Sequence, residues 1–163
     1  MKISEIILAM TAVTVALIAG LFYAWSVSIT QGLLRVSDSE YVAVMQATNR
    51  AIQNPIFFTV FFGAQILLPV CLFLFYGNGA RFWLLVGAFV LYTAGVMGVT
   101  IFGNVPLNNR LDRFEMKAAT AQEISAARTN YETVWNNLNT VRTVSSTLAI
   151  VLVIIACLQS KNE

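Results

Sequence analysis

Four apolar stretches, each long enough to cross a bilayer, constrain this chain more than any other feature of its sequence. They cover approximately residues 6–34, 55–76, 81–102 and 141–158. A helix of about 20 apolar residues spans the roughly 30 Å hydrocarbon core and satisfies its own backbone hydrogen bonds there. The sequence therefore predicts an all-α fold, an integral membrane four-helix bundle formed by one domain over residues 1–163.

The composition supports a membrane protein and argues against several kinds of site. Only 11% of the residues are charged, whereas soluble domains are about a quarter charged. The net charge of +2 without a basic run argues against nucleic acid as a partner. The chain has no histidine, and its two cysteines lie in separate apolar stretches. Histidine-ligated haem, the two-histidine iron site, zinc spacings and a disulfide framework are therefore not indicated. A carboxylate-only metal site stays open, but no acidic residues cluster, so we expect no metal or cofactor.

Two capping-box patterns mark helix starts outside the apolar stretches. Ser37 to Glu40 predicts a short amphipathic helix over about 38–53, which lies along or outside the membrane and ends before Pro55. Thr120 to Glu123 predicts a last helix over about 121–158. At 1.5 Å per residue this helix would be about 57 Å long, so its first half should project from the bilayer. Four crossings place both termini on the same side of the membrane.

Two polar segments are predicted to face each other at one mouth of the bundle. The first is Phe102-Gly-Asn-Val-Pro-Leu-Asn-Asn-Arg-Leu111, which directly follows the third apolar stretch and in which Pro106 predicts a bend or a fresh helix start. The second is a stripe with a spacing of three or four residues, which places its members on one helical face. This stripe consists of Arg128, Tyr131, Trp135, Asn139, Arg142 and Ser146.

Such a pocket would be rich in hydrogen-bond donors and in aromatic rings. The aromatic residues Trp25, Trp135, Tyr23 and Tyr131 would bracket a flat ring, so the pocket suits a planar, anionic or carbonyl-bearing ligand. Arginine at membrane depth is costly, which makes Arg142 a functional candidate. The alternative is that Arg142 reaches the headgroups and that the asparagines cap helix ends. The donors are Asn104, Asn108, Asn109, Arg110, Asn139 and Arg142.

A general base would have to be a carboxylate or a tyrosine, because the chain has no histidine. Glu132, three residues before Trp135, is the best placed candidate. The alternative is that Glu132 is simply solvated. Nucleophilic catalysis has little support, since burial of a cysteine in an apolar stretch raises the pKa of its thiol.

Three segments, in this order and spacing, resemble the anthrone oxygenase-like family. They are Met45-Gln-Ala-Thr-Asn-Arg-Ala-Ile-Gln-Asn-Pro55, Asn104-Val-Pro-Leu-Asn-Asn-Arg-Leu111, and Trp135 with Asn139 and Arg142. The family consists of small four-helix membrane proteins that are widespread in bacteria, and fungal members such as noranthrone monooxygenase oxidise an anthrone to an anthraquinone. The resemblance implies a multi-pass protein of the bacterial inner membrane that uses dioxygen as co-substrate.

The resemblance also suggests roles for the predicted pocket residues. Arg142 and Asn139 would hold a developing oxyanion, Trp135 would stack on the substrate, Asn108 would orient it and Glu132 would act as base. Additional substrate-binding candidates are Asn104, Asn109, Arg110, Tyr131, Tyr23 and Asn49. The expected partners are membrane lipid and a hydrophobic aromatic small molecule, and the small residues on the first and third helices would also suit a homo-oligomer. The alternative function is a non-enzymatic membrane module that binds a quinone, a lipid or a partner subunit.

Overall fold

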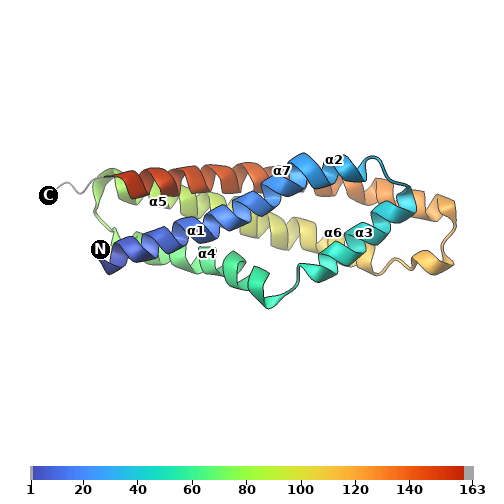
Figure 1. Cartoon of the computed structure of the whole chain (residues 1–163), viewed down its shortest axis with the longest axis horizontal. Coiled ribbons are helices and arrows are strands. Elements are labelled where there is room, and N and C mark those ends of the chain that lie inside the picture. Colours follow the sequence, from blue (N-terminus) through green and yellow to red (C-terminus); the bar gives the residue numbers. More distant parts are fainter. Residues whose placement is uncertain (1, 160–163) are drawn as a thin grey trace.

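The computed structural model describes residues 2–159, and these form a bundle of long helices without a β-strand (Figure 1). Four helices are long and apolar enough to cross a membrane: Ile3–Leu33, Pro55–Leu74, Gly79–Asp112 and Ala121–Leu158. The predicted all-α bundle is therefore confirmed. The four apolar helices also support a multi-pass membrane protein.

The first long helix changes its winding near its end. It consists of α1 (Ile3–Ala24), a π-helical turn η1 (Trp25–Ile29) and α2 (Thr30–Leu33). The π-helix is rare and frequently occurs at functional sites. Here it carries Trp25, whose ring centroid lies 5.4 Å from that of Trp135 on the last helix.

The short helix α3 (Asp38–Ala51) begins with the predicted capping box. The Ser37 hydroxyl accepts a hydrogen bond from the Glu40 backbone N–H at 3.3 Å, and the Glu40 carboxylate accepts one from the Ser37 backbone N–H at 2.9 Å. The Ser37 hydroxyl also donates to the Glu40 carboxylate at 2.6 Å, and this bond together with the one from the Ser37 backbone N–H holds the pKa of Glu40 below its usual value. The α3 helix lies over the first half of the last helix and buries Tyr41, Val42 and Met45 there.

The second and third long helices provide two further walls. Asn54 caps α4 (Pro55–Leu74) by accepting a hydrogen bond from the Phe57 backbone N–H at 3.0 Å. The third consists of α5 (Gly79–Val90), the π segments η2 (Leu91–Gly98) and η3 (Thr100–Asn104), and α6 (Val105–Asp112).

Pro106, which was predicted to bend the helix or to start a new one, does not interrupt the helical backbone of Gly79–Asp112. The backbone stays helical from η3 into α6, with Asn104 at φ −67° and ψ −41°. Pro106 stands in the first turn of α6, where a missing N–H is tolerated. The preceding π turns pair each amide one residue further back than an α-helix does, which relaxes the conflict with the proline ring.

A 3₁₀ turn η4 (Met116–Ala118) leads to α7 (Ala121–Leu158), a single helix of 38 residues. Its predicted capping box is present, since Thr120 accepts from the Glu123 backbone N–H at 3.3 Å and donates its own backbone N–H to the Glu123 carboxylate at 2.7 Å. The helix packs along α1, α5 and η2 in its second half and against α3 and α6 in its first half. Gly95 permits the close contact with η2, because a Cβ there would overlap the side chain of Ser145.

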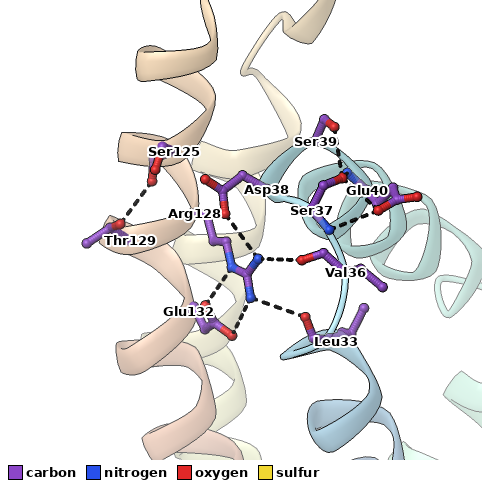
Figure 2. A network of polar contacts seen from close by, with 10 residues as sticks. All are labelled: Leu33, Val36, Ser37, Asp38, Ser39, Glu40, Ser125, Arg128, Thr129 and Glu132. Atoms are coloured by element: carbon purple, nitrogen blue, oxygen red, sulfur yellow. Dashed lines mark hydrogen bonds and ion pairs between the residues drawn. The ribbon is translucent and has the colours of Figure 1, made fainter.

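Arg128 of α7 fixes the connector between α2 and α3 (Figure 2). Its guanidinium donates to the carbonyl oxygens of Leu33 at 3.1 Å and Val36 at 3.0 Å. It also pairs with Asp38 at 3.0 Å and with Glu132 at 2.8 Å. This single side chain therefore ties α3 to the last helix.

We expect Arg128→Met to lower the free energy of unfolding by about 2 kcal/mol, because charge-assisted hydrogen bonds to carbonyls and carboxylates are lost together. Hydrogen–deuterium exchange over residues 38–51 should accelerate. The matched control is Arg50→Met, since the Arg50–Asp112 pair at 2.5 Å is exposed on both sides and should contribute less than about 1 kcal/mol. Equal effects of the two substitutions would contradict the role of Arg128.

The opposite end of the bundle is also held by an arginine. Arg81, at the start of α5, pairs with Glu5 at 2.9 Å and donates a hydrogen bond to the carbonyl oxygen of Gln159. The start of α1 and the end of α7 therefore lie together at one end of the molecule, as Figure 1 also shows.

Candidate functional site

A cavity of about 320 Å³ lies between α3 and the adjoining ends of the long helices, at the end of the bundle opposite the chain termini. Residues from α1, η1, α3, α4, η3, α6 and α7 line it, so it is formed by segments that are far apart in the sequence. Most of its wall is apolar and aromatic. The polar residues on its wall are Thr48, Asn49, Gln53, Thr100, Asn104, Asn108, Asn109, Asn139 and Arg142.

Arg142 forms the charged part of this cavity and is only 6% exposed. Its Nη2 donates to Asn139 Oδ1 at 2.9 Å, and Asn139 Nδ2 donates to Ser26 Oγ at 2.8 Å. The guanidinium carbon lies 4.4 Å from the ring centroid of Phe22 and 5.3 Å from that of Trp135. The side chain therefore lies inside the bundle, and no carboxylate of the described residues pairs with it.

Several buried polar atoms in the cavity wall have no hydrogen-bond partner among the described residues. Asn104 is 1% exposed, and both its Oδ1 and its Nδ2 lack a partner. The same holds for Arg142 Nε and Trp25 Nε1. Buried polar atoms are nearly always hydrogen-bonded, and each exception calls for an explanation. Because these atoms are themselves inaccessible to water, a ligand with an acceptor and a donor would reach them only after neighbouring side chains of the cavity wall had moved.

A second group of polar residues is already linked by hydrogen bonds within the protein. Asn108 Oδ1 accepts from the Tyr131 hydroxyl at 2.7 Å and from Trp135 Nε1 at 2.9 Å. Asn49 Nδ2 donates to the same Tyr131 hydroxyl at 3.1 Å. This network fixes the ring of Trp135 and connects α3, α6 and α7.

The helical spacing explains why these residues meet. Thr100, Asn104 and Asn108 recur every four residues and follow one face through η3 into α6. Trp135, Asn139 and Arg142, spaced by four and three residues, share one face of α7 and also line the cavity. Parts of the two predicted polar segments therefore line one cavity.

The aromatic wall on α4 is a feature that the sequence analysis missed. Phe57, Phe58, Phe61 and Phe62 all line the cavity, and the rings of Phe57 and Phe61 are stacked with centroids 5.1 Å apart. Their spacing of four residues is a signal in the sequence, but a membrane helix is apolar on all faces. Its periodicity therefore does not distinguish a cavity wall from a surface that faces lipid.

Not every predicted site residue lies at the cavity. Asn109 lines it at an exposed position, whereas Arg110 and Tyr131 line a second cavity of about 270 Å³ between α6 and the first half of α7. Tyr23 is 57% exposed and lines neither cavity. The idea that a ligand ring fits between Trp25 and Trp135 is wrong, because these two rings contact each other directly.

Glu132, the predicted base, also lies away from the cavity. Its carboxylate binds Arg128, and its side chain is absent from the cavity wall (Figure 2). We expect Glu132→Gln to change the rate of any reaction in the cavity by less than about threefold, since a positioned general base would contribute about 10²-fold or more. Steady-state kinetics of the two proteins check this, and a hundredfold loss without a change in stability would contradict it.

The chemistry available in the cavity is that of binding and charge stabilisation. Its lining among the described residues offers one guanidinium, the carboxamide of Asn104, whose polar atoms have no partner there, and a wall of phenyl rings, and it includes no carboxylate, imidazole or thiol. Donors held in an environment with little water stabilise a developing oxyanion strongly.

Comparison with known proteins identifies a matching family. Residues 57–152, which include α4, the third long helix and most of α7, match the family model described as anthrone oxygenase. No curated protein and no solved structure matches the chain significantly.

Proposed function

The chain belongs to the anthrone oxygenase family, and we propose that it is a membrane-embedded, metal-independent oxygenase of a flat aromatic substrate, such as an anthrone or a hydroquinone. The family match supports an oxygenase-like function at the level of the family. The substrate class is our inference from the cavity.

The observation that carries the proposal is the pair of unsatisfied groups at the polar end of an aromatic cavity. Arg142 Nε and Asn104 Nδ2 are buried donors without a partner among the described residues. A flat carbonyl-bearing ring between the phenylalanines of α4 and η3 would present its oxygen to these donors. Aromatic contacts of this kind favour planar ligands.

The reaction follows from the charge that these donors stabilise. When an anthrone loses a proton from its methylene carbon, the negative charge moves onto the carbonyl oxygen, where Arg142 and Asn104 would stabilise it. Each such donor is commonly worth about 3 kcal/mol. The guanidinium therefore lowers the pKa of the bound anthrone, and water at the exposed edge near Gln53 and Asn109 accepts the proton.

Dioxygen then oxidises the electron-rich carbon. The carbanion and dioxygen form a carbon hydroperoxide, whose O–O bond breaks as the remaining C–H proton is lost. One oxygen atom stays as the new carbonyl and the other leaves as water, so that the methylene group and one dioxygen give a ketone and one water. This balance needs no further reductant.

Anthrone oxidation by the purified protein tests this proposal. Protein treated with chelators and reconstituted in liposomes should convert anthrone to anthraquinone and consume one dioxygen per turnover, faster than the same liposomes alone. Label from ¹⁸O₂ should be found in the new carbonyl. Absence of turnover on anthrones and hydroquinones would remove the oxygenase assignment.

One observation favours a second candidate function. The cavity wall contains no carboxylate that would act as base, which is compatible with a membrane module that binds a quinone without converting it. Mass spectrometry of the purified protein separates the two functions. A bound quinone without turnover on its reduced form supports the binding module.

We place the protein in the bacterial inner membrane with both ends on one side. The contacts of Arg81 with Glu5 and Gln159 support the second part, because they bring the start of α1 and the end of α7 together.

A further inference from the structure

We propose that the cavity opens sideways into the bilayer, through a window between α4 and the η3–α6 segment, and that the apolar substrate reaches the cavity from the acyl chains. The identity of the occupant follows from the proposed function. The window itself depends on separate observations of exposure and packing.

The first observation is the exposure of four apolar residues that also line the cavity. On α4, Phe58 is 39% and Phe62 is 45% exposed, and on the opposite side Ile101 is 47% and Val105 is 41% exposed. A side chain that lines a cavity and is nearly half exposed stands at its rim. These four residues, the window residues, therefore mark where the cavity reaches the outer surface.

The second observation is the packing of the two walls. The α4 helix packs along α1 and α5 and is hydrogen-bonded to η2 through Tyr92, whereas η3 packs on α7 and α6 packs on α3 and α7. The two sides of the window are thus anchored to different partners and are not held together by an extensive contact of their own. Side chains alone separate the cavity from the surroundings at this point.

The position of the window along the helices indicates what lies outside it. Phe58 and Phe62 are the fourth and eighth residues of α4. At 1.5 Å per residue they lie roughly 5 and 11 Å from the start of this helix. Both walls belong to helices long and apolar enough to cross a membrane. Phe58, Phe62 and Ile101 lie within the predicted spans and Val105 lies just beyond one, so we place the window at the edge of the hydrocarbon region.

The third observation is that the cavity wall becomes more polar and more buried from the window toward Asn104 and Arg142, which form its floor. The window residues are apolar and exposed, while the unsatisfied amide of Asn104 and the Arg142 guanidinium lie buried behind them. A flat molecule with one polar edge would leave the acyl chains with that edge first and would bind it at the floor. The competing path is from water, past the exposed Gln53 beside α3.

Cysteine labelling in liposomes distinguishes the two paths. Thr100→Cys, in a Cys157→Ser background, places a thiol on the cavity wall, and the remaining Cys71 is fully buried. The probe is N-phenylmaleimide, which partitions into bilayers. Phe62→Trp and Val105→Trp narrow the window from its two sides, Gln53→Trp narrows the aqueous path, and Ile66→Trp is an exposed α4 control away from the cavity.

We expect Phe62→Trp and Val105→Trp each to slow labelling at least about tenfold, since filling a close-packed gap forces other side chains to move before a reagent passes. Phe62→Ala should accelerate it, and Ile66→Trp and Gln53→Trp should leave it unchanged. Slowing by Gln53→Trp, with no effect of the two window substitutions, would overturn lateral access. Opposite effects of Phe62→Trp and Phe62→Ala on the labelling rate would indicate that residue 62 restricts access, because a folding defect would change the rate in the same direction in both variants.

A second arm of the experiment tests the occupant independently. 1,8-Dihydroxyanthraquinone, a flat carbonyl-bearing ligand, should protect the thiol at position 100 from the maleimide. Absence of protection with the window effects intact would count against the proposed ligand class and would leave the lateral path supported. Protection without any effect of the window substitutions would support the proposed ligand class and would count against the lateral path.

Discussion

Arg142→Met is expected to lower the rate of anthrone oxidation by about 10³-fold, because it removes a positioned cation from the site of the oxyanion. The arginine is buried and no carboxylate of the described residues neutralises it, so its charge remains available to the substrate. Methionine has a similar length and suits an apolar environment. Replacing a buried charge by an apolar group of similar volume is often close to neutral for folding.

Two further substitutions make the result interpretable. Arg142→Lys keeps the charge but not the planar donor set, so an intermediate loss is expected. Arg110→Met removes an exposed arginine that lines the second cavity and should leave the rate within about twofold, as exposed charges contribute little. The measurement is kcat with anthrone in liposomes, together with the melting temperature in detergent. A rate for Arg142→Met close to that of the parent protein would exclude the oxyanion role.

Asn104→Leu should change activity and stability in opposite directions. Both polar atoms of this side chain lack a partner among the described residues, so the native protein pays the cost of their desolvation without a compensating bond. Leucine would remove this cost, and we expect the free energy of unfolding to rise by about 1 kcal/mol. The loss of a donor to the substrate should lower kcat by about 10²-fold.

Asn108→Leu is the matched control, one helical turn away on the same face. Its side-chain Oδ1 accepts hydrogen bonds from Tyr131 and Trp135, so the loss of this atom should lower the free energy of unfolding by about 2 kcal/mol. The activity should fall as well. Thermal unfolding in detergent and anthrone turnover are measured for both variants. If Asn104→Leu destabilises the protein as much as Asn108→Leu does, Asn104 has a structural role and its assignment to the substrate fails.

The sequence carried most of the information about where helices begin. Ser37 with Glu40 and Thr120 with Glu123 are local patterns whose partners lie three residues apart, so nothing distant decides them. The π segments around Asn104 were not predictable in this way. Their winding depends on how the third long helix packs on α7, and a proline alone suggested a break at that point.

The site was predictable where polar residues stand out from an apolar background. Asn139 and Arg142 are conspicuous on a membrane helix, and their burial follows from the cost of exposing them to lipid. The phenylalanines of α4 have no such contrast with their neighbours. Glu132 was misjudged for a different reason, since Arg128 one turn earlier binds its carboxylate and holds it away from the cavity.

The wide turns of η3 have a consequence for how this architecture can change. A π turn holds more residues than an α turn, so deletion of a single residue within Thr100–Asn104 would return the helix to ordinary winding. The wide turn accommodates about one extra residue, so Asn108 would keep nearly the same direction after such a deletion and the hydrophobic exterior would stay intact. We therefore expect a one-residue deletion within η3 to be tolerated, whereas a one-residue deletion in the α-helical part of the same wall would rotate the following residues by about 100° and change the shape of the cavity.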